Sequence, residues 1–524
     1  MLKKFHLVSD GIDSTVLVWV AIAALCLLSL GTASYALLSP YEARHAGIVH
    51  DMWAGRQYLM PRVDGLPVLD GAPLYYWVSL AFLFVFGVHE WVLRLPSVVS
   101  AALTLVFLVR VLSPGLPPPA LRTLIVLFLL QPALMVAGRF VSPDMLNILL
   151  LTVAAGGFLR AALAVENGCA APFWNICAWV GTALLGLGAG PIAMAVPLSI
   201  VSSWLAIRGR CRVIGALCWC PGLLAIVLLT LPWLWLAAGQ YSGVVAHMFK
   251  RSVFGLLDYG HYLWTEPTYR LCLIPLAGGG LPLLACLYRY RDPARRLAVR
   301  NPVGGFMAVW LAVLVPLHPL VTMTLAGHAA VAVVPLLYFG AQALSPGPRG
   351  HGWRDVRAWG LHLALAGAVG AASLCFLSKQ VSAILPVTEA LGRRYQATTD
   401  KVILLDRYDY EFNFYMRSPK LVYVAADWSG ADGPAAPPWK KELLESARFA
   451  AETSGHLLLD HEEFLRKLCE RRVVNLWIIG SEQAAANHPI LFDLTALPGT
   501  GKVRAWYLAT GMDPGQCAGW GQRH

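Results

Sequence analysis

Charged residues are scarce in this sequence. Only 14% of its 524 residues are Asp, Glu, Lys or Arg, while 57% are hydrophobic. Even a large soluble domain keeps a polar-rich exterior, so this composition excludes an ordinary soluble protein. A lipid bilayer is the solvent that accommodates so much apolar surface, and we therefore expect an integral membrane protein.

A continuous basic patch is also lacking, although the formal net charge is +11. The Lys and Arg residues stand in short clusters between apolar runs, which is typical of the cytoplasmic loops of membrane proteins. Nucleic-acid binding needs a basic face on a folded surface, so no nucleic-acid partner is expected.

Cysteine motifs for metal ions are absent as well. The 11 cysteines are scattered, mostly within apolar runs, and none forms a C-x-x-C pair or a Cys/His cluster. Cysteines in such runs usually serve packing. Cys469 and Cys517 lie in the C-terminal region, where a disulfide between them is conceivable but has no motif to support it.

Long apolar runs recur over the first three quarters of the chain. The first, over 16–38, exceeds the ~7–15 residues of a signal-peptide core, so a retained helix is favoured over a cleaved signal. With the later runs, we expect about eleven transmembrane helices. The later runs are 96–111, 121–136, 145–164, 173–187, 192–207, 213–238, 271–288, 303–317, 320–344 and 359–377.

Arginine clusters between these runs predict the orientation. They occupy 208–212, 289–300 and 349–357, which are inside loops if the N-terminus is cytoplasmic. The positive-inside rule therefore places the chain after residue 378 outside. The long outside loops are then 39–95 and 239–270.

The composition changes from about Leu391 onward. Apolar segments over 401–405, 421–425, 473–480 and 503–509 read as strands, and 439–453 and 462–472 read as helices. Strands that alternate with helices predict a small α/β domain. We therefore expect an all-α polytopic membrane domain over 1–387, with interfacial helices, and an extracytoplasmic α/β domain over 388–524.

Ionisable residues gather where the chain meets the outer face of the bilayer. Glu42 and Arg44 open the first outside loop, and Arg139 and Asp144 stand where a later helix begins on the same side. Such groups are costly at the membrane boundary unless they are paired or functional. For Asp144, which follows a proline, capping of the helix start is an equally good explanation when it is considered alone.

Several short motifs follow one another in a fixed order. They are P-x-E-x-R at 40–44, D-G-x-P with P-L-x-Y-W within 64–77, E-W-x-x-R-L-P at 90–96, the Arg/Asp motif at 139–144 and G-P at 190–191. The set resembles the bacterial aminoarabinose-transferase and protein O-mannosyltransferase group, membrane glycosyltransferases of the type C fold. The resemblance implies transfer of a sugar from a polyprenyl-phosphate donor to a lipid such as lipid A, a glycan or a protein at the periplasmic face of the bacterial inner membrane.

The resemblance also implies roles for individual residues. Glu42 and Asp144 would be the catalytic carboxylates, with one of them as general base for an acceptor hydroxyl. Asp70 and His247 would hold a divalent metal such as zinc, although a capping aspartate and a solvated loop histidine explain them as well. The guanidinium groups that would bind the donor phosphate are those of Arg44, Arg62, Arg139 and Arg251.

Departures from the family pattern leave other functions open. Tyr41 stands where the family has an aspartate, Ala189 where it has a lysine, and Asp70-Gly71-Ala72-Pro73 where it has Glu-Lys-Pro-Pro. A non-catalytic member of the family is therefore one alternative. A transporter or flippase of a lipid-linked sugar is another, although such proteins place ionisable residues at the bilayer centre, and here they lie at its edge.

Overall fold

The structure, a computed structural model, describes residues 13–69, 72–218, 220–250, 301–317, 325–345, 382–469 and 475–509, apart from short gaps within these ranges. The chain forms two compact units. The helical unit comprises 1–35, 70–238 and 245–379, and the mixed unit comprises 36–69, 239–244 and 380–524. The domain boundary expected at 387/388 stays a prediction.

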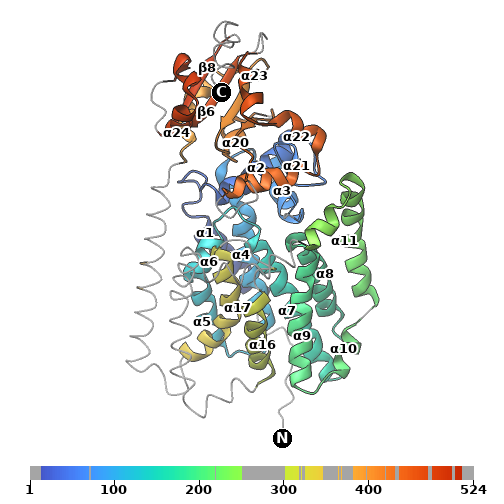
Figure 1. The fold of residues 1–524 in the computed structure, drawn as a ribbon. Coiled ribbons are helices and arrows are strands. Elements are labelled where there is room, and N and C mark those ends of the chain that lie inside the picture. The colour runs from blue at the N-terminus through green and yellow to red at the C-terminus, as the bar shows by residue number, and fades with distance from the viewer. Residues whose placement is uncertain are drawn as a thin grey trace. The chain divides into compact units, whose positions relative to one another are not determined.

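Helices make up the described part of the helical unit. They are α1 Ser14–Ser29, α3 Leu74–Phe86, α4 Glu90–Leu112, α5 Pro118–Leu129, α6 Pro132–Ala137, α7 Asp144–Glu166, α8 Pro172–Ala189, the 3₁₀ helix Pro191–Met194, α9 Ala195–Ile207, α10 Arg212–Leu217, α11 Cys220–Gln240, α16 Pro302–Leu317 and α17 Leu325–Leu344 (Figure 1).

Membrane-spanning length is reached by four helices among the described residues. They are Glu90–Leu112, Asp144–Glu166, Pro172–Ala189 and Gly222–Gln240. The predicted spans 271–288 and 359–377 lie outside the described residues, except for isolated positions in the second. The count of about eleven spanning helices therefore stays a prediction, while the multipass helical character is confirmed.

Several predicted runs were wrong in their boundaries. The N-terminal helix ends at Ser29 rather than near residue 38, and Gly31 follows with φ 80°. The run 121–136 is two helices, α5 and α6, because Pro132 disfavours a helical conformation for the residue before it. The run 213–238 also divides into two helices, α10 and α11.

Helix α7 packs against α4, α8 and α9 (Figure 1). Its contact with α8 uses a glycine from each helix. A Cβ at Gly157 would lie 2.7 Å from the backbone nitrogen of Ala178, and a Cβ at Gly181 would lie 2.9 Å from that of Ala154. Small residues of this kind let two helix backbones approach closely within a membrane.

The mixed unit combines helices with two sheets. Its elements are α2 Tyr41–Ala54, β1 Arg62–Val63, β2 Leu66–Pro67, α19 Leu385–Gly392, β3 Lys401–Leu405, α20 Phe412–Met416, β4 Tyr423–Ala425, α21 Pro438–Ala447, α22 Ala451–Leu457, β5 Leu458–Leu459, α23 His461–Cys469, β6 Leu476–Ser481, α24 Glu482–Asn487, the 3₁₀ helix Pro489–Asp493, β7 Thr495–Ala496 and β8 Val503–Leu508.

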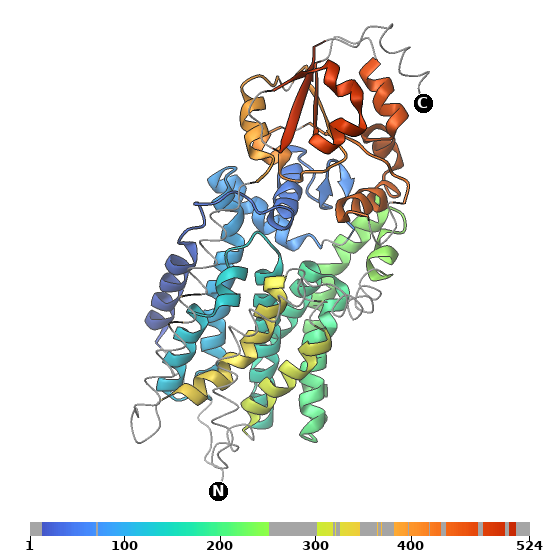
Figure 2. The same cartoon turned by 60° about the vertical axis from the view of Figure 1, so that its left-hand side comes forward.

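Six strands form the larger sheet, in the order β5-β4-β3-β6-β8-β7. β5, β4, β3 and β6 are parallel, whereas β8 is antiparallel to both β6 and β7. Figure 2 shows this sheet with helices packed beside it. The predicted strand at 401–405 is β3, and the predicted helix over 439–453 is instead two helices, α21 and α22.

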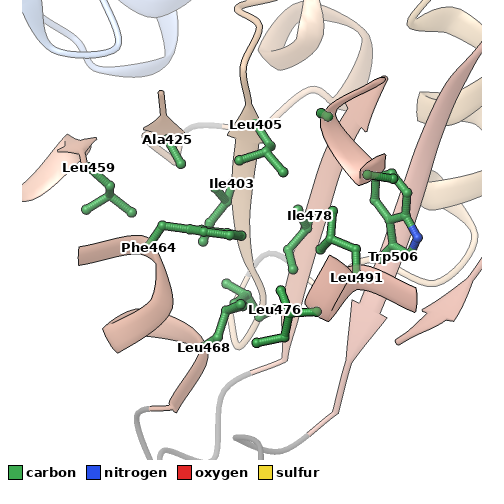
Figure 3. Close-up of a cluster of buried hydrophobic side chains, with 13 residues drawn as sticks. Ile403, Leu405, Ala425, Leu459, Phe464, Leu468, Leu476, Ile478, Leu491 and Trp506 are labelled. Carbon is green, nitrogen blue, oxygen red and sulfur yellow. The ribbon is translucent and has the colours of Figure 1, made fainter. Parts of the chain in front are cut away.

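Side chains on both faces of the central strand β3 are buried. Ile403 and Leu405 join one apolar cluster with Phe464 and Trp506, which Figure 3 shows. Val402 and Leu404 join a second cluster on the opposite face. A strand covered on both faces reads as a continuous apolar run, which explains why this segment could be recognised in the sequence.

Candidate active site

Glu42 lies in the first turn of α2 and is completely buried. Its Oε2 accepts a hydrogen bond from the backbone nitrogen of Leu38 at 3.1 Å, while its own nitrogen donates to the Leu38 oxygen at 2.8 Å. A carboxylate at this position also faces the positive end of the helix dipole. Its neighbour Tyr41, at the family's aspartate position, is 59% exposed.

Arg44, two residues further along α2, forms an ion pair with Glu442 of α21. Its Nε lies 3.0 Å from both carboxylate oxygens, and its Nη2 lies 2.7 Å from Oε1. The hydroxyl of Tyr410 donates to the same carboxylate at 2.5 Å. Because this face of the guanidinium already holds a carboxylate, a donor phosphate would have to replace Glu442 there.

Arg62 opens the hairpin strand β1 and has a different environment. Its guanidinium carbon lies 5.9 Å from the centre of the Tyr241 ring, within cation–π range. Within the described part of the chain, its buried Nε has no hydrogen-bond partner and no carboxylate lies within 4.0 Å of its nitrogens. Of the arginines predicted to bind phosphate, Arg62 therefore retains a donor for an incoming anion.

The turn between β1 and β2 carries a buried aspartate, Asp64. Asp64 and Gly65 both have positive φ values, 47° and 78°, as a two-residue type I′ hairpin turn requires. Oδ2 of Asp64 accepts a hydrogen bond from the Tyr408 hydroxyl at 2.7 Å, and Oδ1 accepts from Nδ2 of Asn413 at 2.9 Å and from the Val422 nitrogen at 3.2 Å. One carboxylate thus joins the first loop to two segments that are more than 340 residues distant in sequence.

Two carboxyl groups of the mixed unit have raised pKa values. Burial, together with the nearby charge of Asp51, raises the pKa of Asp64 from 3.8 to about 7. Burial also raises the pKa of Glu411 from 4.5 to about 7, with Asp409 as the second cause. In both cases loss of solvation outweighs the hydrogen bonds that favour the ionised form.

The mixed unit should therefore lose stability as the pH rises. The folded state holds protons on Asp64 and Glu411 that the unfolded chain releases near pH 4, so their stabilising effect is complete below that pH and is lost as the pH rises through 7. We expect each of the two carboxyls to contribute a loss of roughly 2–3 kcal/mol between pH 5 and 8 to the free energy of local opening. Hydrogen exchange at 62–67, corrected for its intrinsic pH dependence, measures it.

Asp64→Asn combined with Glu411→Gln removes both titrating groups and should flatten this profile. Asp427→Asn is the matched control, because that carboxyl is exposed and the hydrogen bonds from Ser429 lower its pKa. Opening energies that rise with pH in the wild type would contradict the prediction.

In the helical unit, Asp144 is the first residue of α7 and is completely buried. Gly327 of α17 packs directly against it, and a Cβ on this glycine would lie 2.7 Å from the Asp144 Cβ and overlap the carboxylate. One turn further along α7, buried Asn147 lies against Gly188, two residues before the G-P motif. The start of α7, just after the Arg/Asp motif, thus packs against the end of α8, just before the G-P motif.

Arg139 has a structural partner in the same unit. Its Nε donates to the Leu28 oxygen at 3.1 Å, and its Nη2 donates to the Leu27 oxygen at 2.8 Å. These carbonyls belong to the last turn of α1, where a cation also meets the negative end of the helix dipole. Helix capping is therefore the function of Arg139 that its described contacts support.

Gly327→Ala should destabilise the protein, because the added methyl group overlaps the Asp144 side chain and α17 or α7 must shift. Overpacking of this kind costs about 1–3 kcal/mol. Thermal unfolding of the purified protein in detergent should show a Tm lower by several degrees. Gly215→Ala in α10 is the control, since a Cβ there meets nothing within 4 Å. Equal Tm values for the two variants would contradict the close packing.

Three predicted residues fall in the mixed unit, namely Glu42, Arg44 and Arg62, while Arg139, Asp144 and His247 fall in the helical unit. The expected convergence of Glu42 with Asp144 joins different units and stays a prediction. Asp70 and Arg251 lie outside the described residues. Among the residues that are described, no group of three or more His, Cys, Asp or Glu side chains could hold a metal ion.

Sequence reasoning missed the partners of the first loop. Tyr408, Asn413 and Glu442 all come from the C-terminal region, and no local pattern connects them with residues 44 and 64. The D-G motif at 64–65 did signal a turn. It carried no sign that the aspartate side chain would be buried and would accept three hydrogen bonds.

Comparison with known proteins supports this architecture. No protein-family model matches the chain. Undecaprenyl phosphate-alpha-4-amino-4-deoxy-L-arabinose arabinosyl transferase of Edwardsiella ictaluri is 27% identical over 218 residues, which are 39% of this chain and 37% of that protein. The alignment thus spans little more than a third of that relative's length.

Solved structures match over a much larger part of the chain. ArnT from Cupriavidus metallidurans, bound to undecaprenyl phosphate, superimposes with a TM-score of 0.74 at 15% identity, covering 96% of this chain and 100% of that one. The oligosaccharyltransferase of Archaeoglobus fulgidus, in complex with zinc and sulfate, gives a TM-score of 0.52 at 13% identity, covering 89% and 68%. The resemblance seen in the motifs is confirmed, and the chain has the fold of these two solved structures.

Proposed function

We propose that this protein is an integral membrane glycosyltransferase that moves a sugar from a polyprenyl-phosphate donor to a lipid, glycan or protein acceptor. The observation that carries the proposal is the match over 96% of the chain to a transferase bound to undecaprenyl phosphate. The apolar helices of the helical unit suit a lipid-linked donor, and the sugar would be a pentose or a hexose.

In the proposed reaction, the bond between the anomeric carbon and the donor phosphate breaks while an acceptor oxygen forms a new bond to that carbon. Negative charge develops on the departing phosphate, so a fixed cation beside it lowers the barrier. Arg62 is the best-supported candidate, because it retains an unpartnered buried Nε among the described residues. Arg44 is engaged by Glu442 and Arg139 by carbonyls of α1, so neither is assigned this role first.

The acceptor decides whether a base is needed. A hydroxyl acceptor must transfer its proton, and Glu42 or Asp144 would receive it. A phosphate acceptor, as on lipid A, is already nucleophilic and needs no base. Loss of the family's aspartate at Tyr41 is therefore more readily tolerated with a phosphate acceptor, and we propose this acceptor class ahead of a protein hydroxyl.

We place the reaction at the periplasmic face of a bacterial inner membrane, with a cytoplasmic N-terminus and a periplasmic C-terminal α/β domain. Arginine clusters in the inside loops support this orientation. Cys469 is disulfide-bonded, in keeping with an oxidising compartment. A zinc or other divalent ion would be held by Asp70 and His247.

Glycolipid analysis of the cell envelope with and without this chain tests the proposal. The expected result is loss of one sugar from lipid A, another lipid, a polymer or a protein in the deletion strain, with restoration by the wild-type chain. Accumulation of an untransferred lipid-linked sugar on the cytoplasmic side would identify a flippase instead. An unchanged envelope in a strain that makes the donor would indicate a non-catalytic member.

A further inference from the structure

A cavity of about 220 Å³ lies inside the mixed unit, at the amino ends of the neighbouring parallel strands β3 and β4. Its polar lining comes from Tyr395, Asp400, Lys401, Asn413, Ser418 and Lys420, and its apolar lining includes Phe412 and Leu421. None of the residues assigned to sugar transfer lines it. The cavity is therefore a separate feature that the proposed activity does not explain.

Two lysines give this cavity a positive charge. Nζ of Lys401 donates to the Tyr423 hydroxyl at 3.1 Å and lies 5.4 Å from the centre of that ring. Nζ of Lys420 donates to the backbone oxygen of Asp400 at 3.4 Å. Within the described part of the chain, neither ammonium has a carboxylate within 4.0 Å, so each remains available to an anion.

The acidic residue of the lining, Asp400, is already committed to other groups. Its carboxylate accepts hydrogen bonds from Nε1 of Trp477 and Nδ2 of Asn475, both at 2.8 Å, from the Thr399 hydroxyl at 2.9 Å and from the Gln396 nitrogen at 3.0 Å. These four donors occupy the lone-pair sites of the carboxylate, two on each oxygen. Two ammoniums and one fully engaged carboxylate leave the cavity with a net positive charge.

Hydroxyl groups complete the polar wall. Ser418 Oγ lies 3.3 Å from the Tyr395 hydroxyl and accepts a hydrogen bond from the Lys420 nitrogen at 3.2 Å. Lysine ammoniums with neighbouring hydroxyl donors are a recurring way to bind phosphate oxygens. The volume is below the roughly 300–1,000 Å³ of pockets for drug-sized ligands, so the cavity suits a phosphate or a single phosphorylated sugar but not a longer glycan.

We propose that this cavity binds a phosphate monoester, with Lys401 and Lys420 on the phosphate oxygens and Tyr395 and Ser418 as hydroxyl partners. The phosphate comes either from a sugar headgroup or from free inorganic phosphate. Asn413 and Val422 line the same cavity and also hold Asp64 of the first-loop hairpin. Ligand binding is therefore coupled to the hairpin that carries Arg62.

Calorimetric titration of the full-length protein in nanodiscs tests the proposal. The probes are α-D-glucose 1-phosphate, inorganic phosphate and, as the uncharged control, glucose. We expect Lys401→Met with Lys420→Met to weaken phosphate binding by about 100-fold, roughly tenfold for each lost charged hydrogen bond. The matched control is Lys441→Met with Lys502→Met, which removes two exposed lysines of the same unit and should bind like the wild type.

The two phosphate probes distinguish a sugar headgroup from free inorganic phosphate as the source of the bound phosphate. Tighter binding of α-D-glucose 1-phosphate identifies a sugar headgroup, and equal binding identifies free phosphate. If the double variant does not fold, Lys420→Met alone should still weaken binding about tenfold, and ligand should slow hydrogen exchange at 62–67 in the wild type. Absence of saturable binding of both phosphate probes to the wild type, or equal loss in the cavity and control pairs, would overturn the proposal.

Discussion

Arg62→Met should lower the rate of sugar transfer by about 100-fold while the protein remains folded in the membrane. The guanidinium lies beside the Tyr241 ring, and its buried Nε has no hydrogen-bond partner among the described residues. A departing phosphate would supply that partner, and its negative charge grows as the bond to the sugar breaks. The loss should therefore appear mainly in kcat, measured with a polyprenyl-phosphate sugar in detergent or nanodiscs.

Two further variants give this prediction its controls. Arg56→Met removes an exposed arginine from the same loop and should leave the rate unchanged. Arg62→Lys keeps the charge but loses the planar fork, so its rate should lie between those of the wild type and Arg62→Met. Equal rates for Arg62→Met and Arg56→Met would exclude phosphate binding by Arg62.

Periodicity and composition were sufficient to predict the elements whose surroundings are uniformly apolar. The strand 401–405 is apolar at four of five positions because both faces of β3 are covered, and its predicted bounds match the observed ones. The length of the apolar runs predicted the helices. It did not predict where the helices end, because single prolines and glycines determine those positions. Pro132 divides one predicted helix, and Gly31 with its positive φ follows the early end of another.

Pairing between distant segments was beyond the reach of the sequence. Arg44 and Glu442 are 398 residues apart, and Asp64 and Asn413 are 349 apart. The sequence suggested that Arg44, in the P-x-E-x-R motif, binds the donor phosphate, because a guanidinium group at the membrane surface suits phosphate binding. Only the fold reveals that a carboxylate already holds it, and only the fold distinguishes it from Arg62, where a donor is left without a partner among the described residues.

Whether Glu42 or Asp144 acts as a general base determines which class of acceptor the protein can use. Glu42→Gln and Asp144→Asn, made separately, should each be assayed for transfer to a hydroxyl acceptor and to a phosphate acceptor. A general base contributes about 10²–10⁴-fold, so the variant that removes it should lose that factor with the hydroxyl acceptor. With a phosphate acceptor the same variant should keep most of its rate, since there is no proton to remove.

Glu90→Gln is the matched control for both variants, because Glu90 also lies in the first turn of a helix and carries no proposed role. The amide in Glu42→Gln can still accept the hydrogen bond from Leu38, so loss of charge is separated from loss of the local contact. A pH–rate profile that loses its acidic limb in only one variant identifies the base. If both variants match Glu90→Gln with the hydroxyl acceptor, neither carboxylate moves a proton, and their burial serves the packing of α2 and α7 alone.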